Sequence, residues 1–224
     1  MRFLITAGPT REPIDLVRYI SNRSSGKMGY AIAEAALAAG HEVTLISGPV
    51  NLVPPRDAQF LSILTNDEMD DAVHRHLRGC DVLVMCAAAA DYKPAKVAAQ
   101  KIKKRNETLS LELTPARDIL ASLPKQDREF LTVGFAAETN NVERSAKKKL
   151  REKNCDIIVA NDVSSADSGM ESDANEVTLF FRNGEKEYIS SAPKKIIARA
   201  LVKIFSNFAR KKFDKKKVMI TEHD

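Results

Sequence analysis

The chain has 224 residues, of which 44% are hydrophobic and 29% charged, a composition typical of a globular domain with one large core. No apolar run is long enough for a membrane-spanning helix, and the N-terminus lacks the pattern of a signal peptide. The three cysteines, Cys80, Cys86 and Cys155, have no metal-type spacing and predict reduced, buried thiols in a cytoplasmic protein.

The net charge of +5 is concentrated near the C-terminus. Ten Lys or Arg and one acid lie between Lys194 and Lys217, so this stretch carries +9 and the remainder of the chain −4. A basic tail can bind nucleic acid. A solvated terminal extension is the more common explanation for such a charge run, and we favour it over nucleic-acid binding.

Strand-like and helix-like segments alternate along the chain. Residues 3–7 form an apolar run, a glycine- and serine-rich loop occupies 20–29, residues 30–39 have helical spacing, and 43–47 are strand-like. Further strands are predicted at 60–64, 81–87, 130–136 and 155–160, helices at 67–78, 141–153 and 192–208, and a hairpin at 177–189 that turns at Asn183-Gly184. This alternation predicts an α/β, Rossmann-like, doubly wound fold with a mainly parallel sheet.

One lysine-rich segment breaks the alternation. Residues 93–113 are polar, and 109–113 alternate in the manner of a strand. We expect a small subdomain here, either a flap or a dimerisation arm. Its Lys101, Lys103 and Lys104 suit a triphosphate, whose charge needs several donors, although a solvated loop is the usual explanation for such a cluster.

The loop at residues 20–29 lies between a strand and a helix, where loop amides and a helix N-terminus can hold a phosphate. Asn22 adds a neutral donor and Lys27 a cation. The loop is not a P-loop, because Met28 stands where that motif has Ser or Thr. Nor is it a regular dinucleotide fingerprint, because the second strand ends without an acid that would hold a ribose. A turn that merely allows close helix–sheet packing is the alternative.

Other candidate residues follow the ends of predicted strands. Asp91, after the alanine run 87–90, can bind a metal ion or a ligand hydroxyl, or it can cap a turn. Phe135 can stack on a nucleobase or belong to the core. Lys149 and Lys153 share one face of a predicted helix, which by itself is typical of a solvated surface.

Together, these segments resemble a known family. They are residues 5–12 (ITAGPTRE), 15–22 (DLVRYISN), 24–29 (SSGKMG), 90–92 (ADY), 101–104 (KIKK), 134–139 (GFAAET) and 160–163 (ANDV). They closely resemble phosphopantothenate–cysteine ligase, the synthetase half of the bacterial bifunctional coenzyme A biosynthesis protein. The resemblance implies a ligase domain at 1–208 with a flap near 93–113, and leaves 209–224 as a basic tail that we expect to be disordered.

The resemblance implies a two-step reaction. The carboxylate of 4′-phosphopantothenate attacks the α-phosphate of CTP, leaving an acyl-cytidylate, and the cysteine amine then displaces CMP to form the amide. Mg²⁺ and lysines lower the repulsion between the anionic reactants. Family members are homodimers and use CTP or ATP; the bacterial-type motifs favour CTP. The usual preceding decarboxylase domain is absent, so the chain looks like a stand-alone synthetase with a separate phosphopantothenoylcysteine decarboxylase.

The resemblance also implies roles for individual residues. Asn22 would hold and polarise the acyl-cytidylate, Lys101 would stabilise charge during activation, and Asp91 would bind the ribose or the metal-bound triphosphate. Contacts with CTP are implied for Met85, Cys86, Ala87, Asp91, Lys101, Arg117, Asp118, Ile119, Leu120, Phe135, Lys149 and Lys153, and contacts with phosphopantothenate for Ser24, Ser25 and Gly26. The family usually has Asn-Pro-Asp where this chain has Ala116-Arg117-Asp118.

Two other functions are compatible with parts of the sequence. A Rossmann oxidoreductase would need an acid after the second strand and a helical Tyr-x-x-x-Lys pair, and Pro94 interrupts the one match to that pair. A change in NAD(P)H fluorescence on mixing would favour it. A nucleic-acid-binding protein depends on the basic tail alone, and salt-dependent RNA retention that is lost with the tail would favour it.

Overall fold

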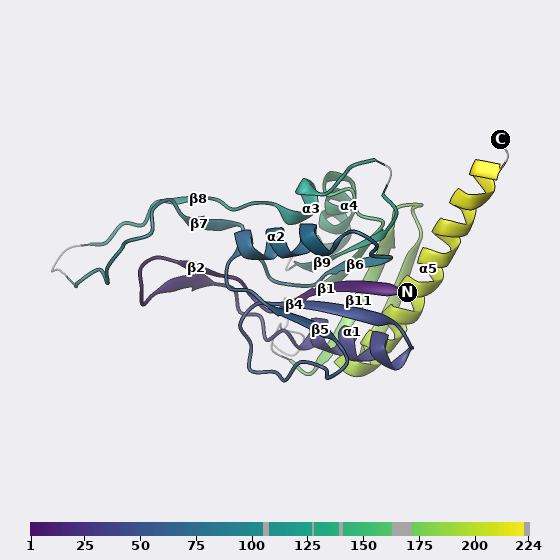
Figure 1. Ribbon diagram of the computed structural model, residues 1–224, viewed down its shortest axis with the longest axis horizontal. Helices are drawn as coiled ribbons and strands as arrows, with labels where there is room; N and C mark the ends of the chain where they lie inside the picture. The colour runs from purple at the N-terminus through teal and green to yellow at the C-terminus, as the bar shows by residue number, and fades with distance from the viewer. Residues whose placement is uncertain (105–107, 127, 139–140, 163–171, 222–224) are drawn as a thin grey trace.

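The computed structural model describes residues 1–104, 108–126, 128–138, 141–162 and 172–221. Figure 1 shows an α/β body from which a long arm carrying β7 and β8 projects on one side and the end of α5 on the other. The strands are β1 (Arg2–Ala7), β2 (Arg11–Pro13), β3 (Tyr19–Ser21), β4 (Glu42–Ser47), β5 (Gln59–Ser62), β6 (Val82–Met85), β7 (Tyr92–Pro94), β8 (Leu113–Pro115), β9 (Leu131–Glu138), β10 (Ile157–Asp162), β11 (Ala174–Phe181) and β12 (Lys186–Pro193). The helices are α1 (Lys27–Ala38), α2 (Asn66–His76), α3 (Ile119–Ser122), α4 (Val142–Glu152) and α5 (Lys194–Thr221).

Among the described residues, eight strands form one sheet in the order β12-β11-β10-β9-β6-β1-β4-β5. The strands from β10 to β5 are parallel, and β11 and β12 add an antiparallel edge. The hairpin between β11 and β12 turns at Gly184, whose φ of 92° suits glycine. The predicted doubly wound, mainly parallel sheet is therefore confirmed. No helix among the described residues combines the length and apolar character needed to cross a membrane.

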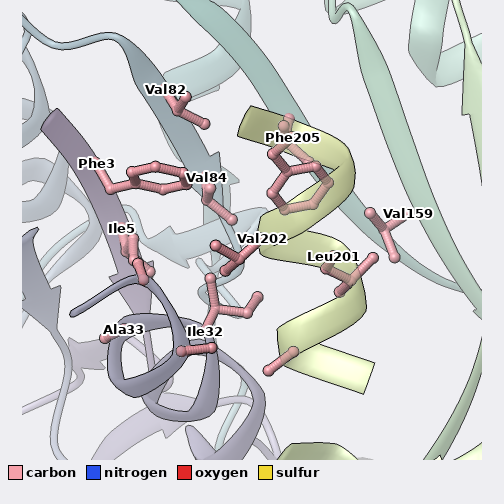
Figure 2. Packing of buried hydrophobic residues seen from close by; sticks show 14 of the residues in the cluster. Phe3, Ile5, Ile32, Ala33, Val82, Val84, Val159, Leu201, Val202 and Phe205 are labelled. Carbon is pink, nitrogen blue, oxygen red and sulfur yellow. The ribbon is translucent and has the colours of Figure 1, made fainter. Parts of the chain in front are cut away.

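Helices cover both faces of the sheet because successive side chains of each central strand point to opposite sides. In β1, Phe3 and Ile5 pack towards α1 and α5, whereas Leu4 packs towards α2. Figure 2 shows the first of these layers, in which Val202 and Phe205 of α5 meet the side chains of β1 and β6. The second layer contains α2, α3 and α4.

The N-terminus of α1 lies unusually close to β1. A Cβ atom added at Gly29 would lie 2.6 Å from the Cβ atom of Ala7, closer than real Cβ contacts allow. Glycine at this position therefore permits the approach of helix and strand. The loop before α1 is held directly at the end of β1 as a result.

The arm at residues 93–113 contains less strand than predicted. Only Leu113 of the predicted strand 109–113 belongs to β8, which pairs with β7 over three residues. The remainder is anchored by contacts with the β2–β3 hairpin. The main-chain amide of Ala98 donates to the oxygen of Ile14 at 2.9 Å, and that of Ile102 donates to Asp15 Oδ2 at 3.0 Å. These individual hydrogen bonds hold the described part of the segment where the alternation predicted a longer strand.

The final helix is longer than predicted. It continues to Thr221 instead of ending near Phe208, so the expected boundary at 208/209 falls inside α5. Ala209 is fully buried, and Lys212 Nζ donates to Asp156 Oδ2 at 2.8 Å and to the oxygen of Phe130 at 3.1 Å. These residues continue the helical spacing from Phe205, which keeps them on the face that packs against the sheet.

Candidate functional site

The carboxyl ends of the parallel strands surround a small cavity beside the loop at residues 20–29. Ligands of open α/β sheets bind at this edge. The cavity has a volume of about 80 Å³, which is room for a phosphate- or carboxylate-sized group but below the roughly 300–1,000 Å³ of a usual ligand pocket. It is lined by Ser24, Ser25, Gly26, Lys27, Met28, Gly29, Cys86, Phe135, Ala136, Ala137, Asn161, Asn175 and Lys194.

Glycine conformation brings this loop to the cavity. Gly26 is the N-cap of α1 with a φ of 73°, in the left-handed region that favours glycine. Gly26 has no side chain with which to cap the first turn of α1. Main-chain amides at a helix N-terminus and the positive end of the helix dipole attract anions. The predicted contacts Ser24, Ser25 and Gly26 therefore lie together, at a place suited to an anionic group.

Asn22 connects this loop to the end of β6. Its side-chain Nδ2 donates to the main-chain oxygens of Ala88 at 3.0 Å and Ala89 at 3.1 Å. The main chain of the alanine run is held from the other side as well, since the amide of Ala90 donates to Thr10 Oγ1 at 3.0 Å. Both N–H groups of Asn22 are thus engaged, so donation to a bound intermediate would require them to exchange partners.

Cys86 and Phe135, two of the predicted nucleotide contacts, line the cavity. Burial raises the pKa of the Cys86 thiol to about 12, so the thiol is neutral at pH 7. Met85 is 8% exposed, and its sulfur accepts from Thr6 Oγ1 at 3.8 Å. Ala87 donates its amide to the same Thr6 hydroxyl. The side chain of Met85 is therefore part of the core, which leaves main-chain groups for any ligand contact.

Two cavity residues were missed by the sequence analysis. Lys194 begins α5 and is 7% exposed; burial lowers its pKa, as does the nearby Lys27. Asn175 belongs to β11 and is 5% exposed. A signal existed for Lys194, because a lysine in the first turn of a helix opposes the helix dipole and is uncommon without a reason.

Asp91 lies at the same edge, beyond the alanine run. Its side chain is exposed and makes no hydrogen bond or ion pair with the described residues. Its main-chain oxygen accepts from the amide of Ala116 at 2.9 Å, so the turn that carries it is fixed. The structure contains no group of three or more potential metal-ligating His, Cys, Asp or Glu within its described parts.

Several other predicted CTP contacts lie on the opposite face of the sheet, with α2, α3 and α4. They are Arg117, Asp118, Ile119, Leu120, Lys149 and Lys153. Arg117 Nη1 donates to Asp70 Oδ2 at 2.9 Å, and this hydrogen bond raises the pKa of Arg117. Asp118 caps α3 by accepting from the amide of Ala121 and pairs with Lys153. Arg117 thus serves to attach the segment to α2, while Asp118 and Lys153 are brought together as one charged pair.

Three further predicted contacts on this face differ in exposure. Ile119 is 4% exposed and packs in the core beneath α3, whereas Leu120 is half-buried between α3 and α4. Lys149 lies on α4, also half-buried. Phe135 differs from this group because its side chain packs on the α1 and α5 side.

Lys101 does not line the cavity; it belongs to the segment between β7 and β8, the arm that projects from the body (Figure 1). The residue beside it is fixed by Asp15, which accepts from the Ile102 amide, while Arg18 Nη2 donates to the oxygen of Ile102 at 2.8 Å. The side chain of Lys101 itself is exposed. Of the other segments singled out in the sequence, Thr139 and Val163 lie outside the described residues.

A larger hollow of about 620 Å³ lies at the opposite, amino-terminal edge of the sheet. Its lining includes Arg2, His41 and Arg75, and the predicted site residues within the described chain are not part of it. The chemistry predicted from the sequence therefore belongs to the smaller cavity and the strand ends around it.

Comparison with known proteins agrees with the fold. The family model for the DNA/pantothenate metabolism flavoprotein C-terminal domain matches residues 1–208. The coenzyme A biosynthesis bifunctional protein CoaBC of Vibrio cholerae is 50% identical over 188 residues, which is 82% of this chain and 47% of that protein. The chain thus spans about half the length of the curated relatives it matches.

Solved structures show the same similarity. The crystal structure of the C-terminal domain of CoaBC is 41% identical, with a TM-score of 0.76, and the match covers 100% of this chain and 96% of that one. A Cab2 variant solved in complex with phosphopantothenate-cysteine has a TM-score of 0.81, 17% identity, and coverage of 96% of this chain and 88% of that one. At that identity, the likeness to Cab2 shows the fold alone.

Proposed function

Because the chain belongs to the DNA/pantothenate metabolism flavoprotein C-terminal domain family, we propose that it is a phosphopantothenate–cysteine ligase of coenzyme A biosynthesis. The observation that carries this proposal is the family match over residues 1–208, which includes every loop around the strand-end cavity.

The reaction that we propose uses CTP. A carboxylate oxygen of 4′-phosphopantothenate attacks the α-phosphorus, the bond to the β-phosphate oxygen breaks, and pyrophosphate leaves. The cysteine amine then attacks the acyl carbon of the acyl-cytidylate, CMP departs with the carboxylate oxygen, and the nitrogen loses a proton. Activation is needed because a free carboxylate is a poor acyl donor, whereas the mixed anhydride has a good leaving group.

The geometry of the cavity supports binding of the anionic groups. The first-turn amides of α1 and the cation of Lys27 face the space at the loop 20–29, where a phosphoryl-sized group fits. Asn22 holds the end of β6 beside this space and has the donor needed by an acyl-phosphate oxygen. Donors placed in advance at such an oxygen stabilise the charge that develops on it.

The nucleotide contacts implied on the α3 and α4 face require a second binding region. The Asp118–Lys153 pair and Lys149 lie there, on the far side of the sheet from Phe135. In the proposal, CTP lies across the carboxyl ends of β6 and β9, with main-chain groups of residues 85–87 towards the base. Lys101 is delivered to the polyphosphate by the arm, which Asp15 anchors at Ile102.

Asp91 fits a Mg²⁺ ion bound together with a nucleotide. Mg²⁺ is usually held by one or two carboxylates plus substrate phosphates and water, so a single exposed carboxylate at the strand end is sufficient. When bound, the ion lowers the negative charge that the incoming carboxylate must approach. The role that remains for the protein is to hold this carboxylate at the edge, through the hydrogen bond between Ala116 and the Asp91 oxygen.

The proposed enzyme is a homodimer. Large apolar side chains are exposed on the two projecting hairpins: Leu16, Val17 and Tyr19 on one, and Tyr92, Leu109, Leu111 and Leu113 on the other. The two hairpins contact each other through Ile14 and Ala98, so these side chains can contribute to one apolar interaction surface. In the family, a flavin-dependent phosphopantothenoylcysteine decarboxylase acts on the product, and we propose it as the next enzyme.

The test is a product assay with each nucleotide. The protein is incubated with 4′-phosphopantothenate, cysteine and either CTP or ATP, and the nucleotides and the amide are separated by chromatography. We expect CMP, pyrophosphate and phosphopantothenoylcysteine in equal amounts with CTP. Product with ATP alone would overturn the choice of nucleotide, and no amide with either would overturn the ligase.

A further inference from the structure

Two lysines from opposite ends of the chain face the strand-end cavity. Lys27 is the first residue of α1 and Lys194 the first of α5, and both line the cavity. The two helices start at the same edge of the sheet and pack against each other. Neither has an acidic residue in its first turn, so both lysines add positive charge to helix ends that are already positive.

Burial makes this arrangement costly for Lys194. Lys194 is only 7% exposed. Burial is the main cause that lowers the pKa of its ammonium group, and the nearby charge of Lys27 is the second. A bound polyanion would reverse both effects, because an opposite charge favours the charged form of a buried lysine. Cys86, which lies nearby, does not supply that charge, because its thiol stays neutral at pH 7.

Oxygen atoms from one short segment contact both ammonium groups in the structure. Lys27 Nζ donates to Asp173 Oδ1 at 2.6 Å, and Lys194 Nζ donates to the main-chain oxygen of Ser172. The side chain of Asp173 is 90% exposed, so its carboxylate is already largely hydrated and loses little interaction energy when the ion pair breaks. An exposed ion pair of this kind is weak and is easily exchanged.

We propose that the polyphosphate of the nucleotide binds between Lys27 and Lys194 and displaces Asp173, so that Lys194 is a binding residue and Asp173 a competing anion. This inference rests on the proposed function only in that the nucleotide supplies the polyphosphate. Loss of Lys194 removes a partner of the ligand. Loss of the Asp173 carboxylate removes a competitor, so the two variants change affinity in opposite directions.

The test measures binding of inorganic tripolyphosphate to the full chain by calorimetry, without divalent cations. We expect Lys194→Gln to weaken binding at least about 10-fold, the effect of about 1.4 kcal/mol, and Asp173→Asn to strengthen it about 3-fold or more. Lys194→Arg should retain binding within about 3-fold of the wild type. Lys195→Gln is the matched control, since Lys195 is the next residue, has a side chain 76% exposed and pairs with Glu34.

Tripolyphosphate that does not bind the wild type, or binds Lys194→Gln equally well, would overturn the inference. Weaker binding by Asp173→Asn would also overturn it, and a gain in affinity cannot arise from partial unfolding. If the variants behave as expected but no amide forms in the product assay, the proposed function fails and the polyphosphate site stands. If the amide forms while the variants bind like the wild type, the inference alone fails.

Discussion

The side-chain amide of Asn22 donates to the main-chain oxygen of Ala88 at 3.0 Å, joining the loop before α1 to the end of β6. The same nitrogen donates to Ala89, so one side chain fixes two successive peptide groups. The loop proposed to face the anionic ligand and the strand end proposed to face the base are therefore held as one unit, and a change at Asn22 affects both.

We predict that Asn22→Asp releases pyrophosphate but forms little amide. The carboxylate cannot donate to the intermediate, and it brings negative charge towards two carbonyl oxygens that now lose their donor. Pyrophosphate and amide are measured in the same reaction. Asn207→Asp, at an exposed position of α5, is the control for the charge change. Amide formation at the wild-type rate by Asn22→Asp would contradict the role of this residue.

We predict that Lys101→Gln lowers kcat by an amount equivalent to about 2–4 kcal/mol in the activation barrier, the effect of one lost transition-state donor. The side chain is exposed, so the thermal midpoint of unfolding should not change. Lys96→Gln, exposed on the same arm, should keep the wild-type kcat. A Lys101→Gln enzyme with wild-type kcat would exclude this lysine from the chemistry.

Asp15 provides a pH-dependent attachment for the arm. The pKa of Asp15 lies well below its usual range. The main cause is the hydrogen bond from the Arg18 side chain, and the amides of Ile102 and Val17 add to it. Because the folded pKa is below the unfolded value near 3.9, the stabilisation is complete above about pH 5 and is lost as the pH falls. We predict that Asp15→Asn is less stable than the wild type at pH 7 and that this gap narrows towards pH 3.

Urea unfolding at pH 7, 5 and 3.5 measures this gap, with Asp57→Asn, at an exposed loop position, as the control. Asp15→Asn should also lower kcat, because the Asp15 carboxylate positions Ile102 beside Lys101. A constant gap across the pH range would show that the Asp15 carboxylate does not titrate with folding.

The end of α5 should affect stability more than catalysis. Truncation after Phe208 removes the buried Ala209 and leaves Asp156, 9% exposed, without the ammonium group of Lys212. The loss of a partner by a buried polar group lowers the free energy of unfolding by about 1–3 kcal/mol. Each kcal/mol of this loss lowers the melting temperature by about 2–4 °C in a chain of this size. Truncation after Asp214 keeps these contacts and is the control. Equal melting temperatures for the two truncations would contradict the packing of this segment.

The strands and the position of the loop before α1 could be predicted because their signals are local. Unbroken apolar runs marked β6 and β10, and Asn183-Gly184 marked the late hairpin. The loop before α1 was identified from its glycines and serines and from its place between a strand and a helix. The physical basis in each case is a short-range one: burial on both faces, a left-handed turn, or a helix N-terminus.

The parts that could not be predicted depend on contacts between distant residues. Lys194 reaches the cavity because α5 starts beside α1, a relation across more than 160 residues that no short motif encodes. The end of the last helix was placed too early for a different reason, since the lysines after Phe208 suggested a solvated tail. The spacing of Phe205, Ala209 and Phe213 was the available signal that the same helical face continues.

Oxygen transfer from the substrate carboxylate to CMP tests the proposed ligase chemistry most directly. 4′-Phosphopantothenate labelled with ¹⁸O in its carboxylate is incubated with CTP, cysteine and the protein, and the CMP is analysed by mass spectrometry. Attack of the carboxylate on the α-phosphorus predicts one ¹⁸O atom in each CMP formed with the amide. Amide formation with unlabelled CMP, or labelled substrate returned without any amide, would contradict the acyl-cytidylate mechanism.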